Sequence, residues 1–280
     1  MQPHATGRES GREGHGSAPA PPPAVAPPLE MINVTVTSLK NPERTVVAQV
    51  NWRVDAGAFW AIGGLQASGK SDFMATAAGL LPPATGTCRV FGRDLAAGFE
   101  HEDLAARLRL GLVFDGGRLL QHLTLAENIS LPLRYHQDCS VRDCAAPVAA
   151  LLELTDLARW ADEYPGNITP NRRQRVGLAR ALALKPELLL LDSPLTGLDP
   201  RDAAWWLDVL SALSAGHPLL ERRPVTLVVT GDDLRPWKNR AREFAALRNK
   251  NFVTLGSPPE AAGPAEMLMQ ELLGAESIHP

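Results

Sequence analysis

Residues 61–73 read AIGGLQASGKSDF and contain the segment that decides the fold. Its central part matches the spacing G-x-x-x-x-G-K-[ST]. The match lies between an apolar strand candidate, 59–63, and a segment with helical spacing, 70–81. In this order, backbone N–H groups and a helix N-terminus can surround a phosphate group. The sequence therefore predicts a phosphate-binding loop made of Gly64, Leu65, Gln66, Ala67, Ser68, Gly69, Lys70, Ser71 and Asp72.

Three residues of this loop have specific expectations. Lys70 is placed to reach the β- and γ-phosphates of a nucleotide, and the Ser71 hydroxyl to ligate Mg²⁺. Ala67 stands where glycine is usual. If that position needs a positive φ, its Cβ costs about 1–2 kcal/mol. Such a cost weakens binding without abolishing it.

Strand and helix candidates alternate on both sides of the loop. Residues 187–192 (ELLLLD) form an apolar run that needs burial on both faces, which is typical of a central parallel strand. The alternation predicts an α/β fold with a parallel sheet. Further strands are expected at 31–39, 46–54, 87–92, 110–114 and 225–230, mostly helical structure at 118–184, a helix at 201–214, and a basic αβ piece at the end.

The two ends of the chain differ from this pattern. Residues 1–30 are rich in Gly, Pro, Ala and Ser, and we expect a disordered or extended tail because nothing there can bury a core. The folded domain is expected over 31–256. Residues 257–280 are rich in Pro and Ala and are expected to form a second tail, with one short helix at 264–273.

Composition excludes several classes of protein. The net charge of −3 predicts no general affinity for nucleic acid. Cys88, Cys139 and Cys144 form neither a disulfide framework nor a zinc-site pattern, and they suit a reducing compartment. No apolar run reaches the roughly 18 residues of a membrane span, and no signal-peptide pattern is present. A soluble, cytoplasmic protein is expected, with any membrane contact made through a partner.

Two later stretches carry a family resemblance. Residues 110–133 (LGLVFDGGRLLQHLTLAENISLPL) and 173–200 (RQRVGLARALALKPELLLLDSPLTGLDP) resemble the ATP-binding cassette (ABC) ATPases. The resemblance extends over nearly all of 31–250, and LTLAENISLPL is similar to the subunits of lipid and organic-solvent importers. It implies a P-loop NTPase: a RecA-like core with a parallel sheet, an N-terminal antiparallel β piece, and a helical subdomain inserted at about 118–170.

The resemblance also implies partners and cofactors. Two such subunits form a head-to-tail dimer, either homo- or heterodimeric. The dimer sandwiches two ATP molecules, with Mg²⁺, between one phosphate loop and the other subunit's signature segment. A grooved face near 118–135 would receive integral membrane permease subunits, which would hold the protein peripherally on the inner face of the membrane.

Several positions carry family roles. Lys70, Ser71 and Asp192 stand where the family has its phosphate and Mg²⁺ ligands, and Asp199 matches the aspartate of the loop that crosses the dimer interface. The usual glutamine that senses Mg²⁺ and the γ-phosphate is Asp115 here. A carboxylate can ligate Mg²⁺ as an amide oxygen does, although it is shorter and negative.

The signature segment departs from the family pattern. It falls on residues 168–172, ITPNR. Thr169 keeps a hydroxyl, whereas Pro170 replaces a glycine and removes one backbone N–H. Asn171 and Arg172 can still donate hydrogen bonds. An altered γ-phosphate contact and a lost function both remain open.

The catalytic positions depart further. Ser193 replaces the family's glutamate and Gly231 its histidine, and Asp232 and Asp233 follow the latter. Residues 38–46 contain no aromatic side chain to stack on adenine. A group that orients or activates water typically contributes about 10²–10⁴-fold to the rate. We therefore expect nucleotide binding without fast hydrolysis by the usual route, unless Asp115, or less favourably Asp232, supplies the carboxylate.

Two functions follow from these expectations. The leading hypothesis is the ATP-binding subunit of an ABC transporter, in which ATP-driven dimerisation acts on separate membrane subunits. The alternative is a regulatory ATP-binding switch with little turnover and no role in transport.

Other features receive plainer interpretations. We expect at least one of Trp205 and Trp206 to be core. The arginines of one predicted helix, Arg172, Arg173, Arg175 and Arg180, are expected to be solvated beyond its first turn, and the basic run 235–250 is interpreted as a solvated surface.

Overall fold

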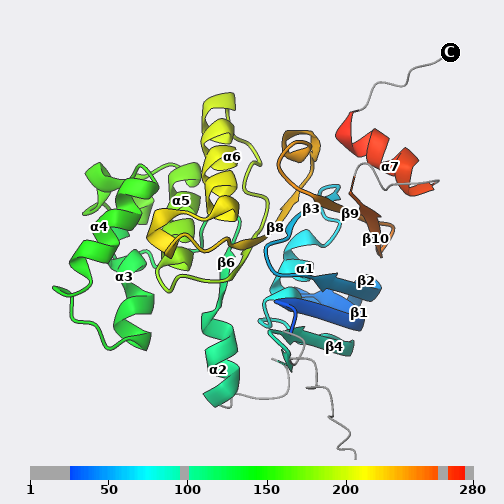
Figure 1. The fold of residues 1–280 in the computed structure, drawn as a ribbon, viewed down its shortest axis with the longest axis horizontal. Coiled ribbons are helices and arrows are strands. Elements are labelled where there is room, and N and C mark those ends of the chain that lie inside the picture. Colours follow the sequence, from blue (N-terminus) through cyan, green and yellow to red (C-terminus); the bar gives the residue numbers. More distant parts are fainter. Residues whose placement is uncertain (1–25, 95–100, 258–263, 275–280) are drawn as a thin grey trace, which may run out of the picture.

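The computed structural model describes residues 26–94, 101–257 and 264–274. Within these ranges the strands form one sheet in the order β5-β4-β1-β2-β10-β9-β3-β8-β7-β6 (Figure 1). The expectations for residues 1–25, 258–263 and 275–280 lie outside the described residues. The fold is the α/β arrangement that the alternating strands and helices predicted.

The first part of the sheet is antiparallel. β1 (Leu29–Ser38) pairs in this sense with β2 (Asn41–Val54) and β4 (Thr85–Val90), and β4 pairs with β5 (Arg93–Asp94). This is the antiparallel β piece that the resemblance implied. β1 begins two residues before the expected start of order, and Leu29 is fully buried.

The second part of the sheet is mainly parallel. β9 (Glu243–Arg248), β3 (Phe59–Gly64), β8 (Thr226–Gly231), β7 (Leu188–Leu191) and β6 (Leu110–Val113) lie side by side and point the same way. β10 (Asn251–Gly256) returns antiparallel to β9. The carboxyl ends of β3, β6, β7 and β8 therefore share one edge, where the predicted site residues follow.

Burial on both faces explains the apolar sequence of β7. Leu188 and Leu190 contact the core that α1 covers, whereas Leu189 and Leu191 contact the core on the opposite face. Side chains alternate between the faces of a strand, so a central strand needs apolar residues at every position. The run LLLL therefore belongs in the middle of a sheet covered on both sides.

The helices cover these two faces. α1 (Lys70–Ala77) follows the phosphate loop, and α2 (His101–Leu108) precedes β6. α1 ends at Ala77, before the expected residue 81. Gly79, two residues later, has a φ of 68°, which is not helical. The remaining helices are α3 (Leu125–His136), α4 (Ala145–Leu154), α5 (Pro170–Leu182), α6 (Pro200–Ala215) and α7 (Pro264–Leu273). None of the described helices is long and apolar enough to span a membrane.

The helical subdomain lies at one end of the molecule. Figure 1 shows α3 and α4 far from β1, β2 and β4, with α5 between them and the sheet. The chain enters α3 through a capping box, in which Thr124 and Glu127 each accept a hydrogen bond from the other's backbone N–H. Short 3₁₀ turns at Ala158–Trp160 and Pro165–Asn167 then lead into α5.

Two plain interpretations from the sequence need correction. The solvated arginine face on α5 is wrong for Arg175, which is 6% exposed, lies over the Trp205 ring and pairs with Asp202 at 2.7 Å. Residues 235–250 are not a solvated surface throughout, because Trp237 is buried and β9 supplies core residues such as Phe244. The expectation for the tryptophan pair is confirmed, since Trp206 is fully buried.

Candidate functional site

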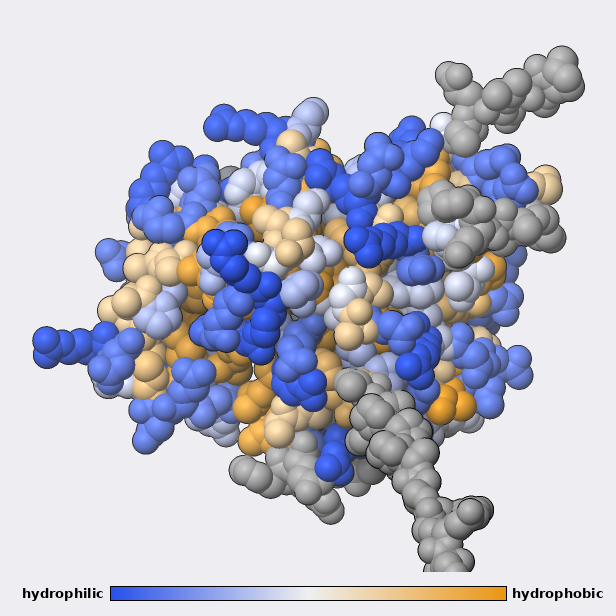
Figure 2. All heavy atoms as spheres, in the orientation of Figure 1, coloured by the Kyte–Doolittle hydropathy of each residue, from blue (hydrophilic) through white to orange (hydrophobic). Residues whose placement is uncertain are grey.

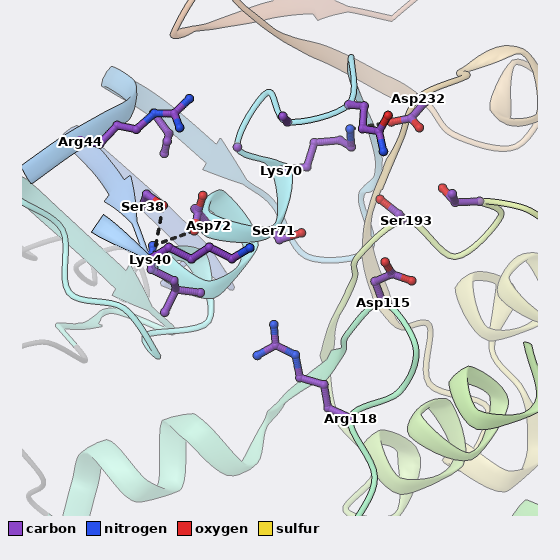
Figure 3. A pocket seen from close by; sticks show the side chains of 16 residues that line it. Ser38, Lys40, Arg44, Lys70, Ser71, Asp72, Asp115, Arg118, Ser193 and Asp232 are labelled. Atoms are coloured by element: carbon purple, nitrogen blue, oxygen red, sulfur yellow. Dashed lines mark hydrogen bonds and ion pairs between the residues drawn. The ribbon is translucent and has the colours of Figure 1, made fainter. Parts of the chain in front are cut away.

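A pocket of about 690 Å³ opens at the shared carboxyl edge of the parallel strands (Figure 3). It receives residues from the phosphate loop, from the turn after β6 and from the turns after β7 and β8. The sequence-predicted residues that line it are Gln66, Ala67, Gly69, Lys70, Ser71, Asp72, Asp115 and Ser193. The fold thus brings together residues as far apart as Ser38 and Asp232, which are separated by 194 positions in the chain.

The phosphate loop has the backbone that the sequence required. Ala67 has a φ of 62°, so the condition under which its Cβ costs free energy is met. Gly69 has a φ of 93°, and a Cβ there would lie 2.9 Å from Val46 Cβ. Glycine at this position lets the loop turn closely over β2 before α1 begins.

The loop also contains a buried hydroxyl without a partner. Ser68 Oγ is buried and makes no hydrogen bond within the described structure, while Ser68 N donates to Leu65 O at 3.1 Å. Buried polar atoms usually have partners, and an orphan often marks a ligand position. Ser68 itself does not line the pocket, whereas Gly69, Lys70 and Ser71 do, and the N–H groups at the start of α1 would donate to phosphate oxygens, so the residues present suit a phosphate group.

Lys70 is held at the centre of the site. Its ammonium group donates to Gly64 O at 2.7 Å, Leu65 O at 3.0 Å and Asp232 Oδ1 at 2.6 Å. The side chain is only 8% exposed. The first two contacts fix the lysine to its own loop, and the third joins it to the turn after β8.

Asp192 and Ser193 follow β7 behind the loop. Asp192 is 3% exposed, and its Oδ1 accepts hydrogen bonds from Thr230 Oγ1 at 3.1 Å and from Ser193 Oγ at 3.3 Å. Ser193 has a φ of 52°, and its backbone N–H donates to Thr230 Oγ1. Thr230 therefore orients both residues, and this role was missed in the sequence. The signal was its place at the end of β8, beside β7.

Asp115 lies in the turn after β6. Burial and the nearby Asp192 carboxylate raise its pKa, while the Gly116 N–H and Arg118 oppose that shift. The turn rests on α5, because the Arg180 guanidinium donates to Gly117 O at 2.8 Å and Arg118 O at 3.1 Å. The structure therefore supplies two neighbouring acidic groups, of which Asp115 lines the pocket and the buried Asp192 does not.

These oxygen groups suit Mg²⁺ in combination with a phosphate. Mg²⁺ prefers oxygen ligands and is commonly held by one or two carboxylates plus substrate phosphates. No group of three or more His, Cys, Asp or Glu residues within the described ranges could hold a metal by itself. The candidate set of Asp192, Asp115 and the Ser71 hydroxyl thus requires the nucleotide to complete the coordination.

The family's other positions lie elsewhere or carry no side chain. Gly231 ends β8, and a Cβ there would meet only ordinary contacts, the nearest being Asp233 O at 3.5 Å. The segment from Thr169 to Arg172 forms the start of α5 and does not line this pocket. Asp199 caps α6 by accepting from Asp202 N at 2.9 Å.

Within the signature segment, three side chains already have partners. Asn171 Oδ1 accepts from Trp206 Nε1 at 3.1 Å, and the Arg172 guanidinium lies 3.8 Å from the centre of the Trp160 ring. Thr169 caps the helix through its hydroxyl, which accepts from Arg172 N. The start of α5 is therefore a fixed surface.

Sequence reasoning also missed several cations of the pocket. Lys40, Arg44 and Arg118 line it together with Lys70 (Figure 3). Among the described residues no aromatic side chain lines this pocket, and residues 38–46 contribute only Ser38, Leu39, Lys40, Arg44 and Val46 to it. The pocket thus offers positive charge for a polyphosphate but no ring for stacking on a base.

Comparison with known proteins gives consistent similarities. Residues 47–196 match the family model described as ABC transporter. The chain is 33% identical over 240 residues to the sulfate/thiosulfate import ATP-binding protein CysA of Synechococcus elongatus, covering 84% of this chain and 65% of that protein. It is 31% identical over 252 residues to the methionine import ATP-binding protein MetN of Lactobacillus delbrueckii subsp. bulgaricus, covering 88% and 70% respectively.

Solved structures give the same result. The dimeric bacterial ABC transporter cassette MJ0796 matches with a TM-score of 0.70 and 26% identity, covering 80% of this chain and 95% of that one. The same values hold for the post-hydrolysis dimer of that cassette bound to ADP and Pi. The pocket described above is therefore found in a chain whose fold and sequence both resemble ATP-binding cassettes.

Proposed function

Since this chain belongs to the ABC transporter family, we propose that it is an ATP-binding subunit of an ABC import transporter that hydrolyses ATP slowly. The observation that carries the proposal is the phosphate loop, in which the buried lysine Lys70 and the N-terminus of α1 line one pocket. The chain spans 65% of the length of CysA and 70% of that of MetN.

The binding roles follow from the contacts. Lys70 and the N–H groups at the start of α1 bind the phosphates, and Lys40, Arg44 and Arg118 add positive charge around them. Asp192, Asp115 and the Ser71 hydroxyl hold Mg²⁺, which neutralises the phosphate charge when bound. Thr230 holds the Asp192 carboxylate in place through a hydrogen bond to its Oδ1.

Slow hydrolysis follows from the residues at the two catalytic positions of the family. A serine hydroxyl at position 193 is not a base at neutral pH, and Gly231 offers no side chain to a γ-phosphate. Losing groups that orient or activate water costs about 10²–10⁴-fold in rate. Most of the binding contacts remain, so affinity for ATP is retained while turnover falls.

Asp115 is the carboxylate best placed to replace the missing base, and in that role it leaves Asp192 and the Ser71 hydroxyl as the protein ligands of Mg²⁺. It lines the same pocket as Lys70, Ser71 and Ser193, and burial raises its pKa, which makes it a better proton acceptor once ionised. A single-turnover experiment compares the wild type with Asp115→Asn. A lower rate in the variant supports this role, whereas equal rates exclude it.

The remaining parts of the proposal concern assembly. The start of α5, from Thr169 to Arg172, faces a second subunit's nucleotide in a head-to-tail dimer, and Asp199 lies near the dimer interface. The dimer is either a homodimer or a heterodimer with a more complete partner. Integral membrane permease subunits then place the protein peripherally on the inner face of the membrane.

A groove suited to the permease is present. It encloses about 420 Å³ between α2, β6, α3 and α5, and Leu104, Leu108 and Leu110 give it an apolar floor beside Arg107, His136 and Arg180. On the face drawn in Figure 2, hydrophobic residues likewise reach the surface between hydrophilic ones. A short amphipathic segment of a membrane subunit matches this combination of surfaces.

Two measurements test the proposal. Calorimetric titration of Mg·ATP should show binding to the wild type, and Lys70→Ala should bind with at least tenfold lower affinity. Affinity purification from cells should recover an integral membrane protein. Binding without a membrane partner would instead favour the regulatory switch, and no binding at millimolar ATP would contradict both functions.

A further inference from the structure

The Asp232 carboxylate accepts a hydrogen bond from Lys70, the lysine that is expected to bind the phosphates. A lysine ammonium has three donors, and those of Lys70 are directed to Gly64 O, Leu65 O and Asp232 Oδ1. The contact to Asp232 is the shortest of the three, at 2.6 Å. Figure 3 shows the two side chains near each other at the rim of the pocket.

The fold sets this contact by register. β3 and β8 are parallel neighbours, with Gly63 opposite Gly231. The chain leaves β3 into the phosphate loop and leaves β8 into Asp232, so the carboxylate emerges beside the loop. The adjacent acid is directed elsewhere, because Asp233 binds the Arg235 guanidinium at 2.7 Å, which lowers the pKa of Asp233.

The two partners differ in their freedom to move. Lys70 is 8% exposed, whereas Asp232 is 48% exposed. A ligand phosphate can therefore displace the carboxylate into water while the lysine stays in place. Until then, an internal anion neutralises the ammonium group, and it repels any further negative charge brought near it.

Building on the proposed function, we propose that Asp232 is an intramolecular competitor of the nucleotide phosphates and sets the affinity of this pocket for polyphosphates. A charge-assisted hydrogen bond must be broken before Lys70 can bind a phosphate. The effect increases with the charge of the ligand, so it weakens ATP binding more than ADP binding. If Asp232 instead positioned Lys70 for the phosphate, replacing Asp232 would weaken ATP binding.

The test is a calorimetric titration of Mg·ATP and Mg·ADP into wild type, Asp232→Asn and the matched control Asp233→Asn. Asp232→Asn should bind ATP about tenfold more tightly, a change of about 1.4 kcal/mol, with a smaller gain for ADP. Asp233→Asn should stay within about twofold of wild type, since Asp233 does not contact Lys70. Asp232→Ala gives an independent measurement if the asparagine variant does not fold.

A double variant shows whether the gain acts through Lys70. In a Lys70→Ala background, Asp232→Asn should improve affinity by clearly less than in the wild-type background, because residues in contact are coupled. Equal or weaker ATP binding by Asp232→Asn and Asp232→Ala, with a wild type that binds, would overturn the competitor role alone. No binding by any variant at millimolar nucleotide would overturn both this role and the proposed function.

Discussion

Ala67 adopts a left-handed backbone conformation, with a φ of 62°, within the phosphate loop. A Cβ in that region costs about 1–2 kcal/mol, and glycine gives back about 0.4–1 kcal/mol of it through a more flexible unfolded chain. Ala67→Gly should therefore raise the free energy of unfolding by about 0.5–1 kcal/mol. The control Ala75→Gly, inside α1, should lower it by about 1 kcal/mol in the same denaturant titration. Equal losses in both variants would contradict the strain at position 67.

The three cysteines also differ residue by residue. Burial raises the pKa of Cys88 to about 12 and that of Cys144 to about 11, whereas Cys139 is partly exposed. The thiolate is the reactive form, and at pH 8 a pKa of 12 leaves only about one thiol in ten thousand ionised. Iodoacetamide should alkylate one cysteine, Cys139, in the native protein and all three cysteines after denaturation. Mass spectrometry of wild type and Cys139→Ser checks this, and rapid native labelling of Cys88 would contradict it.

At the scale of elements, the sequence allowed prediction of those with a strong local pattern. The LLLL run and the glycine loop indicated β7 and α1 because burial on two faces and phosphate-loop geometry leave few alternatives. The sequence interpretation did not identify α2 at all. It also missed the β9–β10 hairpin, in which the consecutive buried residues 244–247 lie within the basic run 235–250.

The candidate site shows the same division. Lys70, Ser71 and Asp192 belong to local motifs and were predicted. Thr230 and the Lys70–Asp232 contact depend on which strands become neighbours, and only the register of β3, β8 and β7 reveals them. The buried Arg175 was missed for a similar reason, since Trp205 and Asp202 come from another helix, α6.

The turn after β6 gives a prediction at this scale. Gly116 and Gly117 have φ values of 66° and 77°, so a Cβ strains both, yet only the one at Gly117 meets an obstacle, Arg173 O at 2.2 Å. Gly117→Ala should therefore lower the free energy of unfolding by about 1–3 kcal/mol more than Gly116→Ala. Denaturant unfolding of the two variants measures the difference. Equal losses would mean that the turn does not pack against α5 as described.

For the whole molecule, nucleotide should control association. The start of α5 is fixed by its own contacts and lies outside the pocket, so it is available to a second subunit. With slow hydrolysis, Mg·ATP should convert the purified chain from monomer to a lasting dimer, whereas Mg·ADP should not. Light scattering after size-exclusion chromatography gives the mass. A monomer under all conditions would indicate that the dimer needs a different partner chain.

The central claim is that this chain binds Mg·ATP through Lys70 but splits it slowly, because Ser193 and Gly231 replace the family's catalytic side chains. The most direct measurement is a rapid-quench experiment with radiolabelled ATP, comparing wild type with Ser193→Glu. Wild type should retain intact ATP, and Ser193→Glu should form ADP about 10²-fold or more faster, because the variant regains a carboxylate beside Asp192. Rapid ADP formation by the wild type alone, or no retention of ATP, would contradict the account.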